Sequence, residues 1–188
     1  CNKLRLLWKQ NNMQKKKIAF VVAIPGSAEA FLVNHLERLT QTYDVSLIAN
    51  FPENYDASFF KGMKINFINA PIERKISIKN DLKAFAALYK IFKKNKFDSV
   101  HSVTPKAGLL TAMAAWLAGV NNRIHIYTGQ VWATRKGAMR TMLKMMDKMI
   151  AILDNHILVD GEGQRQFLIT QGIVKAKKSS VLAHGSIC

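Results

Sequence analysis

The feature that most constrains the fold is a repeated alternation of short apolar segments with longer amphipathic segments. The first apolar segment, KIAFVVAI at 17–24, has no polar residue after its lysine, which is typical of a strand covered on both faces. Repeated strand–helix alternation predicts an α/β fold with a Rossmann-like, doubly wound parallel sheet. The expected strands are residues 17–24, 43–50, 63–69, 97–102, 123–128, 155–160 and 180–184.

End signals and apolar spacing predict helices between these strands. Ser27 follows the turn at Pro25 and Gly26 and is the expected N-cap of the first helix, because its hydroxyl accepts a free backbone N–H. Thr104 and Pro105 start a later helix, since proline at the first helical position loses no hydrogen bond. Two further helices are expected to bury apolar stripes, one made of Leu82, Phe85, Ala86, Tyr89 and Phe92 and the other of Met139, Met142, Leu143, Met146, Met149, Ile150 and Leu153.

The chain is strongly basic, with 28 Lys and Arg residues against 12 Asp and Glu residues and a formal net charge of +16. Such an excess favours an acidic partner, which is a nucleic acid, an anionic membrane or a phosphate-bearing ligand. Nucleic acid is the least expected of these, because the sequence has no helix-turn-helix signature and no aromatic-rich platform for single strands. No apolar run approaches the ~18 residues that a membrane-spanning helix needs.

The residues that commonly bind metals are dispersed. Cys1 and Cys188 lie at the two ends of the sequence, which is neither a metal-binding spacing nor a disulfide framework, and a reducing cytosol is the expected compartment. Neither a metal nor a cofactor is expected, because the remaining candidate ligands form no cluster. Four histidines are scattered along the chain, at His35, His125, His156 and His184.

Three loops are expected on the rim where a ligand binds, because doubly wound sheets bind ligands beyond the carboxyl ends of their strands. These loops are residues 25–27, 102–106 and 128–136. The Gly26–Ser27 turn precedes a helix, whose free N–H groups attract anions. The alternative is a turn and cap without a ligand, because neither the G-x-G-x-x-G pattern nor the P-loop pattern is present.

The second loop carries three candidate side chains, each with a structural alternative. Lys106 places a cation at a helix N-terminus, which the helix dipole disfavours, so it indicates an anionic ligand. The alternative for Lys106 is a solvated surface lysine. His101 precedes the loop, and a half-buried histidine with a satisfied side chain is the alternative to a general base. Thr104 is either a helix cap or a ligand contact.

A cationic ridge is expected on the helix that begins at Gly137. Lys136, Arg140, Lys144 and Lys148 recur at every fourth residue and therefore lie on one side of that helix, next to its methionine-rich face. One interpretation is a core face with a solvated ridge. The other is a monotopic protein that lies on an anionic membrane through Arg140, Lys144 and Lys148.

Two sequence blocks are specific enough to indicate a family. The blocks TPKAG at 104–108 and YTGQVWATRKG at 127–137, together with most of the sequence from 13 to 187, resemble the N-terminal half of family-4 glycosyltransferases. The closest resemblance is to bacterial enzymes that build capsule, O-antigen or other lipid-linked surface glycans. Members of this family have the GT-B fold, in which two Rossmann-like domains face a cleft. The resemblance implies that the N-terminal domain mainly binds the acceptor and the C-terminal domain the nucleotide sugar.

The resemblance also implies roles for the residues of the rim. The 128–136 loop corresponds to the acceptor side of the cleft, where Trp132 is expected to stack on a sugar and Arg135 and Lys136 to hold the diphosphate of a lipid-linked acceptor. The structural alternative is a tryptophan that fills the domain interior beside two surface cations. Gly26 and Ser27 are expected on the donor-phosphate side. The full set of expected acceptor contacts is His101, Thr104, Lys106, Thr128, Gln130, Trp132, Arg135 and Lys136.

Residues 1–12 are expected to be a basic extension outside the fold, and residues 13–188 the acceptor-side domain, ending at the hinge. The donor domain is then absent, and the chain alone is expected to be inactive. Two departures from the family stand out. Val103 occupies a position where many relatives have a second histidine, so a histidine-dependent role cannot be assigned there. Gly161 and Gly163 lie in a turn where relatives commonly have serine.

The expected activity of the complete enzyme is a retaining transfer of a hexosyl-type sugar from a nucleotide-sugar co-substrate, without a metal, at the inner face of the plasma membrane. A rival from another class is a non-catalytic basic module that binds an anionic membrane or nucleic acid. A second rival is a nucleotide-binding Rossmann enzyme such as an epimerase, against which the missing G-x-G-x-x-G pattern counts.

Overall fold

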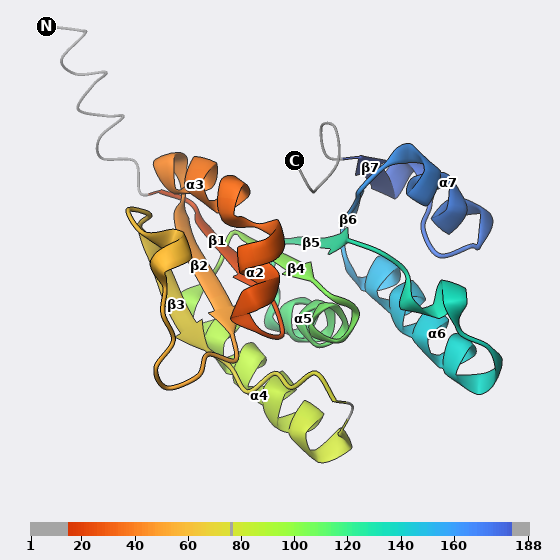
Figure 1. Ribbon diagram of the computed structural model, residues 1–188, viewed down its shortest axis with the longest axis horizontal. Helices are drawn as coiled ribbons and strands as arrows, with labels where there is room; N and C mark the ends of the chain where they lie inside the picture. The colour runs from red at the N-terminus through yellow and green to blue at the C-terminus, as the bar shows by residue number, and fades with distance from the viewer. Residues whose placement is uncertain (1–14, 76, 182–188) are drawn as a thin grey trace, which may run out of the picture.

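The computed structural model describes residues 15–75 and 77–181, which form one parallel sheet with helices on both faces (Figure 1). The strand order is β3-β2-β1-β4-β5-β6-β7, and every neighbouring pair is parallel. The predicted fold class is therefore confirmed. The strands are β1 Lys17–Val21, β2 Asp44–Ala49, β3 Ile65–Asn69, β4 Ser99–Val103, β5 Asn122–Tyr127, β6 His156–Val159 and β7 Ser179–Val181.

The strand order reverses beside β1, because the chain moves from β1 to β2 on one side and later continues from β4 on the other side. The carboxyl ends of β1 and β4 are thus the topological switch point, where doubly wound sheets form their ligand crevice. Each of the first six predicted strands is present, with its ends displaced by a few residues. The predicted seventh strand is observed at 179–181, and the rest of its expected range lies outside the described residues.

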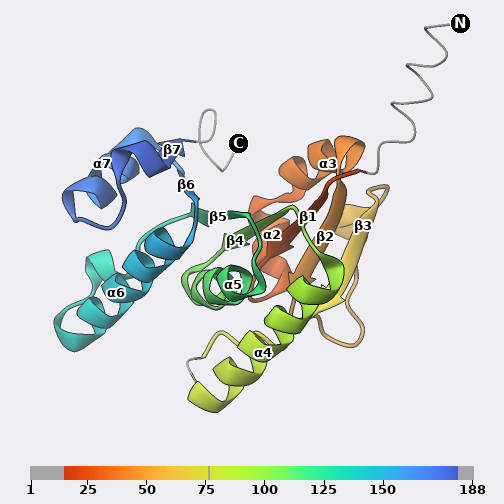
Figure 2. The same cartoon turned by 180° about the vertical axis from the view of Figure 1, so that it is seen from behind.

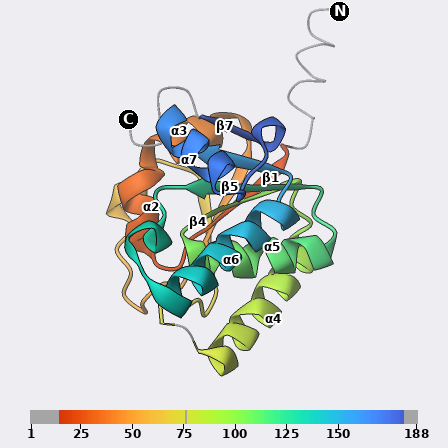
Figure 3. The same ribbon diagram turned by 90° about the vertical axis from the view of Figure 1, so that its right-hand side faces the viewer.

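The helices form two layers. Successive side chains of a strand point to opposite faces of the sheet, so each face has its own core. In β1, Ala19 and Val21 face one helix layer, and Phe20 and Val22 face the other. Helices α4, α5 and α6 lie side by side on the first face (Figures 2 and 3), and α2 and α3 cover the second. The helices are α2 Pro25–Phe31, α3 Val33–Thr42, α4 Ile78–Asn95, α5 Pro105–Ala118, α6 Gly137–Leu153 and α7 Glu162–Thr170, and the short 3-10 turns are η1 Ser58–Phe60, η2 Val131–Thr134 and η3 Ala176–Lys178.

Helix α5 approaches the sheet more closely than a helix with side chains on that face could. A methyl group on Gly108 would lie 2.4 Å from Cε1 and 2.7 Å from Nδ1 of His125. The ring of His125 is buried in β5 and hydrogen-bonded through Nδ1 to Ser102 Oγ at 2.7 Å, so it cannot move aside. The glycine of the TPKAG block therefore sets the distance between α5 and strands β4 and β5.

Gly108→Ala is expected to lower the free energy of unfolding by about 1–3 kcal/mol, the usual cost of an overpacked core site. Helix propensity alone predicts the opposite sign, because alanine is favoured over glycine by about 1 kcal/mol. Urea unfolding decides between these effects. The matched control is Gly163→Ala in α7, where no atom lies near the added methyl group and a small gain in stability is expected. A Gly108→Ala protein as stable as this control would contradict the close packing.

Three helix predictions were wrong in detail. Helix α2 begins at Pro25, so Ser27 lies in its first turn and makes no side-chain cap, and a break at Leu32 separates α2 from α3. In α4 the buried side chains are Ala84, Leu88 and Phe92, whereas Leu82 is 63% exposed. The third error concerns α6, where Ile150 is buried as predicted but Asp147 and Ala151 are buried with it, and three of the four predicted methionines are exposed.

Candidate functional site

A cavity of about 360 Å³ lies at the carboxyl ends of β1 and β4, at the topological switch point. Its floor comes from Ala23 after β1 and from the start of α5, and its apolar wall comes from α6. Arg74, in the segment between β3 and α4, brings a cation to its edge. The residues that line it are Ala23, Arg74, Thr104, Pro105, Lys106, Leu143 and Met146. The structure thus brings together two predicted site residues, Thr104 and Lys106, with one that was not predicted, Arg74.

Thr104 is the strained residue of this cavity. Its backbone has φ 74° and ψ 137°, a left-handed region that β-branched residues rarely occupy and that costs about 1–3 kcal/mol. Its side chain does not cap α5, and its buried Oγ1 has no hydrogen-bond partner among the described residues. The predicted cap is therefore wrong, although Pro105 does occupy the first turn as predicted. The cavity thus has an unused hydroxyl next to the N-terminus of a 14-residue helix.

Lys106 is held by protein groups. Its ammonium lies 2.5 Å from Asp81 Oδ1 and donates to the carbonyl oxygen of Lys75. These contacts tie the first turn of α5 to the segment before α4. Lys106 therefore shapes the rim, and its charge is already compensated. Arg74, by contrast, has no ion-pair partner within the described chain, which makes it the available cation of the cavity.

The loop from β5 to α6 places two of its predicted cations in solvent. Arg135 and Lys136 are exposed after η2, and Gly137, with φ +64°, turns the chain from that loop into α6. Thr128, at the end of β5, is half-buried. Gln130 accepts a hydrogen bond of 3.2 Å from Gln164 Nε2 of α7, and its own buried Nε2 has no partner among the described residues.

The prediction that Trp132 stacks on a sugar is wrong. Its side chain is 1% exposed, and its ring stacks on that of Phe167 with centroids 5.4 Å apart. Its Nε1 donates to Asp147 Oδ2 at 2.7 Å. The cations near its ring are Arg140 at 6.0 Å and Lys144 at 5.4 Å, not Arg135 and Lys136. Trp132 is thus the structural anchor of the loop, as the alternative interpretation had it.

The structure favours the structural alternative for His101. His101 lies inside β4, where its ring stacks on Phe20 at 4.6 Å and its Nε2 meets Ser99 Oγ at 3.0 Å, toward the amino end of the strand. Burial lowers the pKa of His101 to about 4, so the ring is neutral at physiological pH. This is the half-buried, satisfied histidine of the structural alternative.

Gly26 and Ser27 lie in the first turn of α2, after the carboxyl end of β1. Ser27 is buried and its backbone N–H donates to Ile24 O at 3.1 Å. A methyl group at Gly26 would meet only Glu29 Oε2, at 4.0 Å, so the backbone here is open to close approach. Their assignment to the donor-phosphate side stays a prediction.

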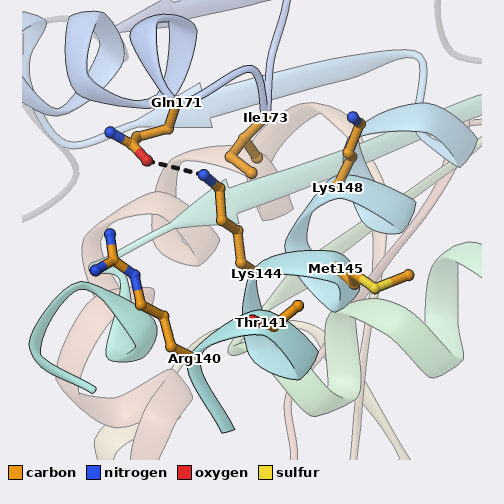
Figure 4. Close-up of a pocket in the computed structure, with 7 residues that line it drawn as sticks. All are labelled: Arg140, Thr141, Lys144, Met145, Lys148, Gln171 and Ile173. Atoms are coloured by element: carbon orange, nitrogen blue, oxygen red, sulfur yellow. Dashed lines mark hydrogen bonds between the residues drawn. The ribbon is translucent and has the colours of Figure 1, made fainter. Parts of the chain in front are cut away.

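Three of the four residues of the predicted cationic ridge, all except Lys136, line a second cavity of about 480 Å³ between α6 and the end of α7 (Figure 4). Arg140, Lys144 and Lys148 all point toward this space. Lys144 Nζ donates to Gln171 Oε1 at 2.8 Å. The predicted methionine core is wrong, because Met139, Met142 and Met149 are 51%, 39% and 43% exposed.

Two carboxylates of this helix are buried, one within α6 at Asp147 and one at its C-cap, Asp154. Burial raises the pKa of Asp147 to about 6, and the hydrogen bond from Trp132 opposes this rise. Burial also raises the pKa of Asp154 to about 7, against the attraction of Arg123 and Lys178. Neither carboxylate is part of a metal site, because the described residues contain no group of three or more His, Cys, Asp or Glu side chains that could hold an ion.

Comparison with known proteins identifies the family. The family model described as "Glycosyl transferase 4-like" matches residues 17–155. A capsular polysaccharide biosynthesis glycosyltransferase, CapM, of Staphylococcus aureus is 33% identical over 116 residues, which is 62% of this chain and 30% of that protein. The UDP-Gal:alpha-D-GlcNAc-diphosphoundecaprenol alpha-1,3-galactosyltransferase of Escherichia coli is 30% identical over 175 residues, 91% of this chain and 45% of that protein. The chain thus spans less than half the length of each of these relatives.

Solved structures agree on the fold. The lipopolysaccharide outer core galactosyltransferase WaaB superposes with a TM-score of 0.64 at 16% identity, over 88% of this chain and 44% of that one. A UDP-N-acetylglucosamine 2-epimerase from Rickettsia bellii gives a TM-score of 0.67 at 16% identity, over 89% and 44% of the two chains. The fold is therefore shared by transferases and epimerases, and the family is identified by the match to the family model and to the two curated relatives. The chain belongs to the glycosyl transferase 4-like family, as the N-terminal, Rossmann-like half of a GT-B glycosyltransferase.

Proposed function

We propose that this chain is the acceptor-binding half of a retaining glycosyltransferase that acts in the biosynthesis of a capsule, O-antigen or other surface polysaccharide. The donor is a nucleotide sugar, a co-substrate bound mainly by residues beyond this chain, and no metal or cofactor takes part. The acceptor is a glycan linked to a lipid through a diphosphate. The match of 91% of this chain to 45% of an enzyme named for a diphosphoundecaprenol substrate supports this acceptor class.

The observation that carries the proposal is the cavity at the switch point. It combines an uncompensated guanidinium, Arg74, with an unused hydroxyl, Thr104, at the N-terminus of α5. A guanidinium can bind two oxygens of a phosphate at once, and a helix N-terminus favours negative charge. The wall formed by Leu143 and Met146 is apolar, which suits the start of a lipid chain. A lipid diphosphate has the matching combination of anionic and apolar parts.

The chemistry assigned to the chain is positioning. An acceptor hydroxyl oxygen forms a bond to the anomeric carbon of the donor sugar, while the bond from that carbon to the nucleotide diphosphate breaks and the hydroxyl proton is released. Arg135 and Lys136, exposed at the same rim, extend the positive charge around the acceptor. Fixing the acceptor at this rim lowers the barrier by removing its freedom to rotate and diffuse.

The protein is proposed to work at the cytoplasmic face of the plasma membrane without crossing it. A lipid-linked acceptor stays in the bilayer, so the enzyme has to approach the surface. No helix in the described part of the chain has the length and apolar character to cross a membrane. The excess of positive charge favours the anionic surface of the bilayer.

Arg74→Ala, Arg135→Ala and Lys136→Ala are each expected to lower kcat/KM for the lipid-linked acceptor by at least about tenfold in the complete enzyme, equivalent to about 1.4 kcal/mol. The melting temperature should stay nearly unchanged, because exposed charges contribute little to stability. The measurement is sugar transfer at varied acceptor concentration. Hydrolysis of the donor without acceptor should change much less, since these residues do not contact the donor.

The matched control is Lys64→Ala, an exposed lysine beside β3 that lines no cavity described above. Its kcat/KM should equal that of the unmodified enzyme. If Lys64→Ala reduces transfer as much as the three site variants do, the effect comes from net charge and the acceptor site is misplaced. Full activity in all three site variants would reject the acceptor assignment directly.

A further inference from the structure

A groove with concentrated positive charge runs between α6 and the segment from Gln171 to Lys178. It consists of two adjoining cavities of about 480 and 500 Å³, which share Lys148 and Ile173. Among the described residues that line these cavities none is acidic, whereas six are cations with side chains that have no ion-pair partner within the described chain. These six are Arg140, Lys144, Lys148, Lys175, Lys177 and Lys178.

The cations of the groove are arranged by neutral partners. Lys144 donates to the amide oxygen of Gln171, so its position is fixed while its charge stays uncompensated (Figure 4). Lys178, at the far end, donates instead to the carbonyl oxygens of Ala151 and Ile152, which end α6. Lys178 is therefore held by the backbone at the end of α6, and the charges available to a ligand are those of the other five cations.

An exposed apolar ridge borders the same groove. Met145 and Ile152 line the two cavities and are 60% and 65% exposed. Met149, 43% exposed, lies between them on the same side of α6. Flexible apolar side chains next to a row of cations are typical of helices that lie in the plane of a membrane interface. A free soluble anion would account for the cations but not for this ridge.

We propose that the α6–α7 groove binds the phosphate headgroup of an anionic phospholipid while the ridge of Met145, Met149 and Ile152 enters the boundary between headgroups and acyl chains. This site is separate from the cavity at the switch point, with which it shares no lining residue. The inference rests on the proposed function, because an enzyme for lipid-linked acceptors works at a bilayer. The occupant is the membrane itself rather than the acceptor.

The first test is binding of the chain to vesicles of phosphatidylcholine with and without phosphatidylglycerol, measured by co-sedimentation. The double variant Lys144→Gln/Lys148→Gln is expected to bind the anionic vesicles at least about tenfold more weakly. The matched control is Lys61→Gln/Lys64→Gln, which removes the same charge from exposed positions beside β3. Equal losses in the two double variants would show diffuse attraction by net charge and overturn the site.

The second test examines the ridge and the headgroup separately. Met145→Ser/Met149→Ser should leave the fold unchanged, since both side chains are exposed, and should weaken binding to anionic vesicles most at high salt, where electrostatic attraction is screened. Short-chain phosphatidylglycerol below its micelle concentration should give saturable NMR shifts at the amides of Gln171 and Ile173. Identical shifts with inorganic phosphate at the same concentration would indicate a free anion and overturn the lipid assignment.

A duplex oligonucleotide serves as the competing polyanion. If it binds more tightly than anionic vesicles and the groove variant weakens both equally, the surface is for nucleic acid and the proposal is wrong. These assays contain neither donor nor acceptor, so they do not depend on sugar transfer. If the chain binds vesicles as expected but the complete enzyme transfers no sugar, the proposed function is rejected and the lipid-binding groove is still supported.

Discussion

Trp132→Ala is expected to lower the free energy of unfolding by about 3–5 kcal/mol, as for other large buried aromatic side chains. The indole is 1% exposed and packs on Phe167, so its removal leaves a cavity between η2, α6 and α7. It also leaves Asp147 Oδ2 without its donor, which adds the cost of an unpaired buried carboxylate. Urea unfolding of the chain measures the loss.

Two further variants divide this effect into its parts. Trp132→Phe keeps an aromatic ring against Phe167 but removes the Nε1 donor and the volume of the second ring, so it should cost about 1–3 kcal/mol. Val131→Ala, next in sequence and 49% exposed, should stay within about 0.5 kcal/mol of the unmodified chain. A Trp132→Ala chain as stable as the Val131→Ala chain would show that the indole is a surface group, and the ligand-stacking role would return.

The sheet could be predicted because its signal is local. Each strand is a short apolar run, and the order of runs and amphipathic segments already implies parallel pairing. The switch point follows from that topology, which is why the predicted rim loop 102–106 borders the cavity through Thr104 and Lys106. The predicted loops 25–27 and 128–136 contribute no lining residue, and Ala23, which also lines the cavity, was predicted as part of the first strand. The ends of the elements were less certain, since Pro25 can either form a turn or start a helix, and here it starts α2.

The buried face of α6 could not be predicted, because hydrophobic spacing assigns methionines to the core and carboxylates to solvent. Asp147 is buried because an indole N–H distant in sequence donates to it. Asp147 therefore belongs to the buried face, whereas Met142 and Met149, which were predicted to be buried, are exposed. The burial of Asp147 depends on the contact between η2 and α6, which forms only in the tertiary structure and leaves no local sequence signal.

The candidate site also depends on tertiary contacts that the sequence does not reveal. Thr104 and Lys106 were placed correctly, but Lys106 is paired with Asp81, a contact made when α4 packs beside α5. Arg74 was missed because its loop, after β3, carries no glycine pattern and no helix signal. Its one available clue was its position after a strand, and therefore on the carboxyl rim.

Asp147→Asn is expected to change how the stability of the chain depends on pH. The pKa of Asp147 is raised from 3.8 to about 6 by burial, so the folded state binds its proton more tightly than the unfolded state does. Stability from this group is then fully present below about pH 4 and is lost as the pH rises through about 6. A shift of this size corresponds to a loss of about 3 kcal/mol at higher pH.

Asparagine stays neutral at every pH and its Oδ1 still accepts the hydrogen bond from Trp132. The difference in unfolding free energy between Asp147→Asn and the unmodified chain should therefore grow in favour of asparagine from about pH 4 to pH 7 and then level off, with a total change of about 1–3 kcal/mol. A constant offset is expected as well, because the buried Asp147 Oδ1 has no partner among the described residues, and asparagine would place an NH2 donor without an acceptor at that position.

The measurement is urea unfolding of both chains at a series of pH values, with Glu53→Gln as the control for an exposed carboxylate. The control should follow the unmodified chain closely, because surface substitutions usually change stability by less than about 0.5 kcal/mol. A difference between Asp147→Asn and the unmodified chain that stays flat from acid to neutral pH would show that Asp147 is ionised without penalty. In that case the carboxylate would have access to water or to a cation, and the closed packing of Trp132 over α6 would be incorrect.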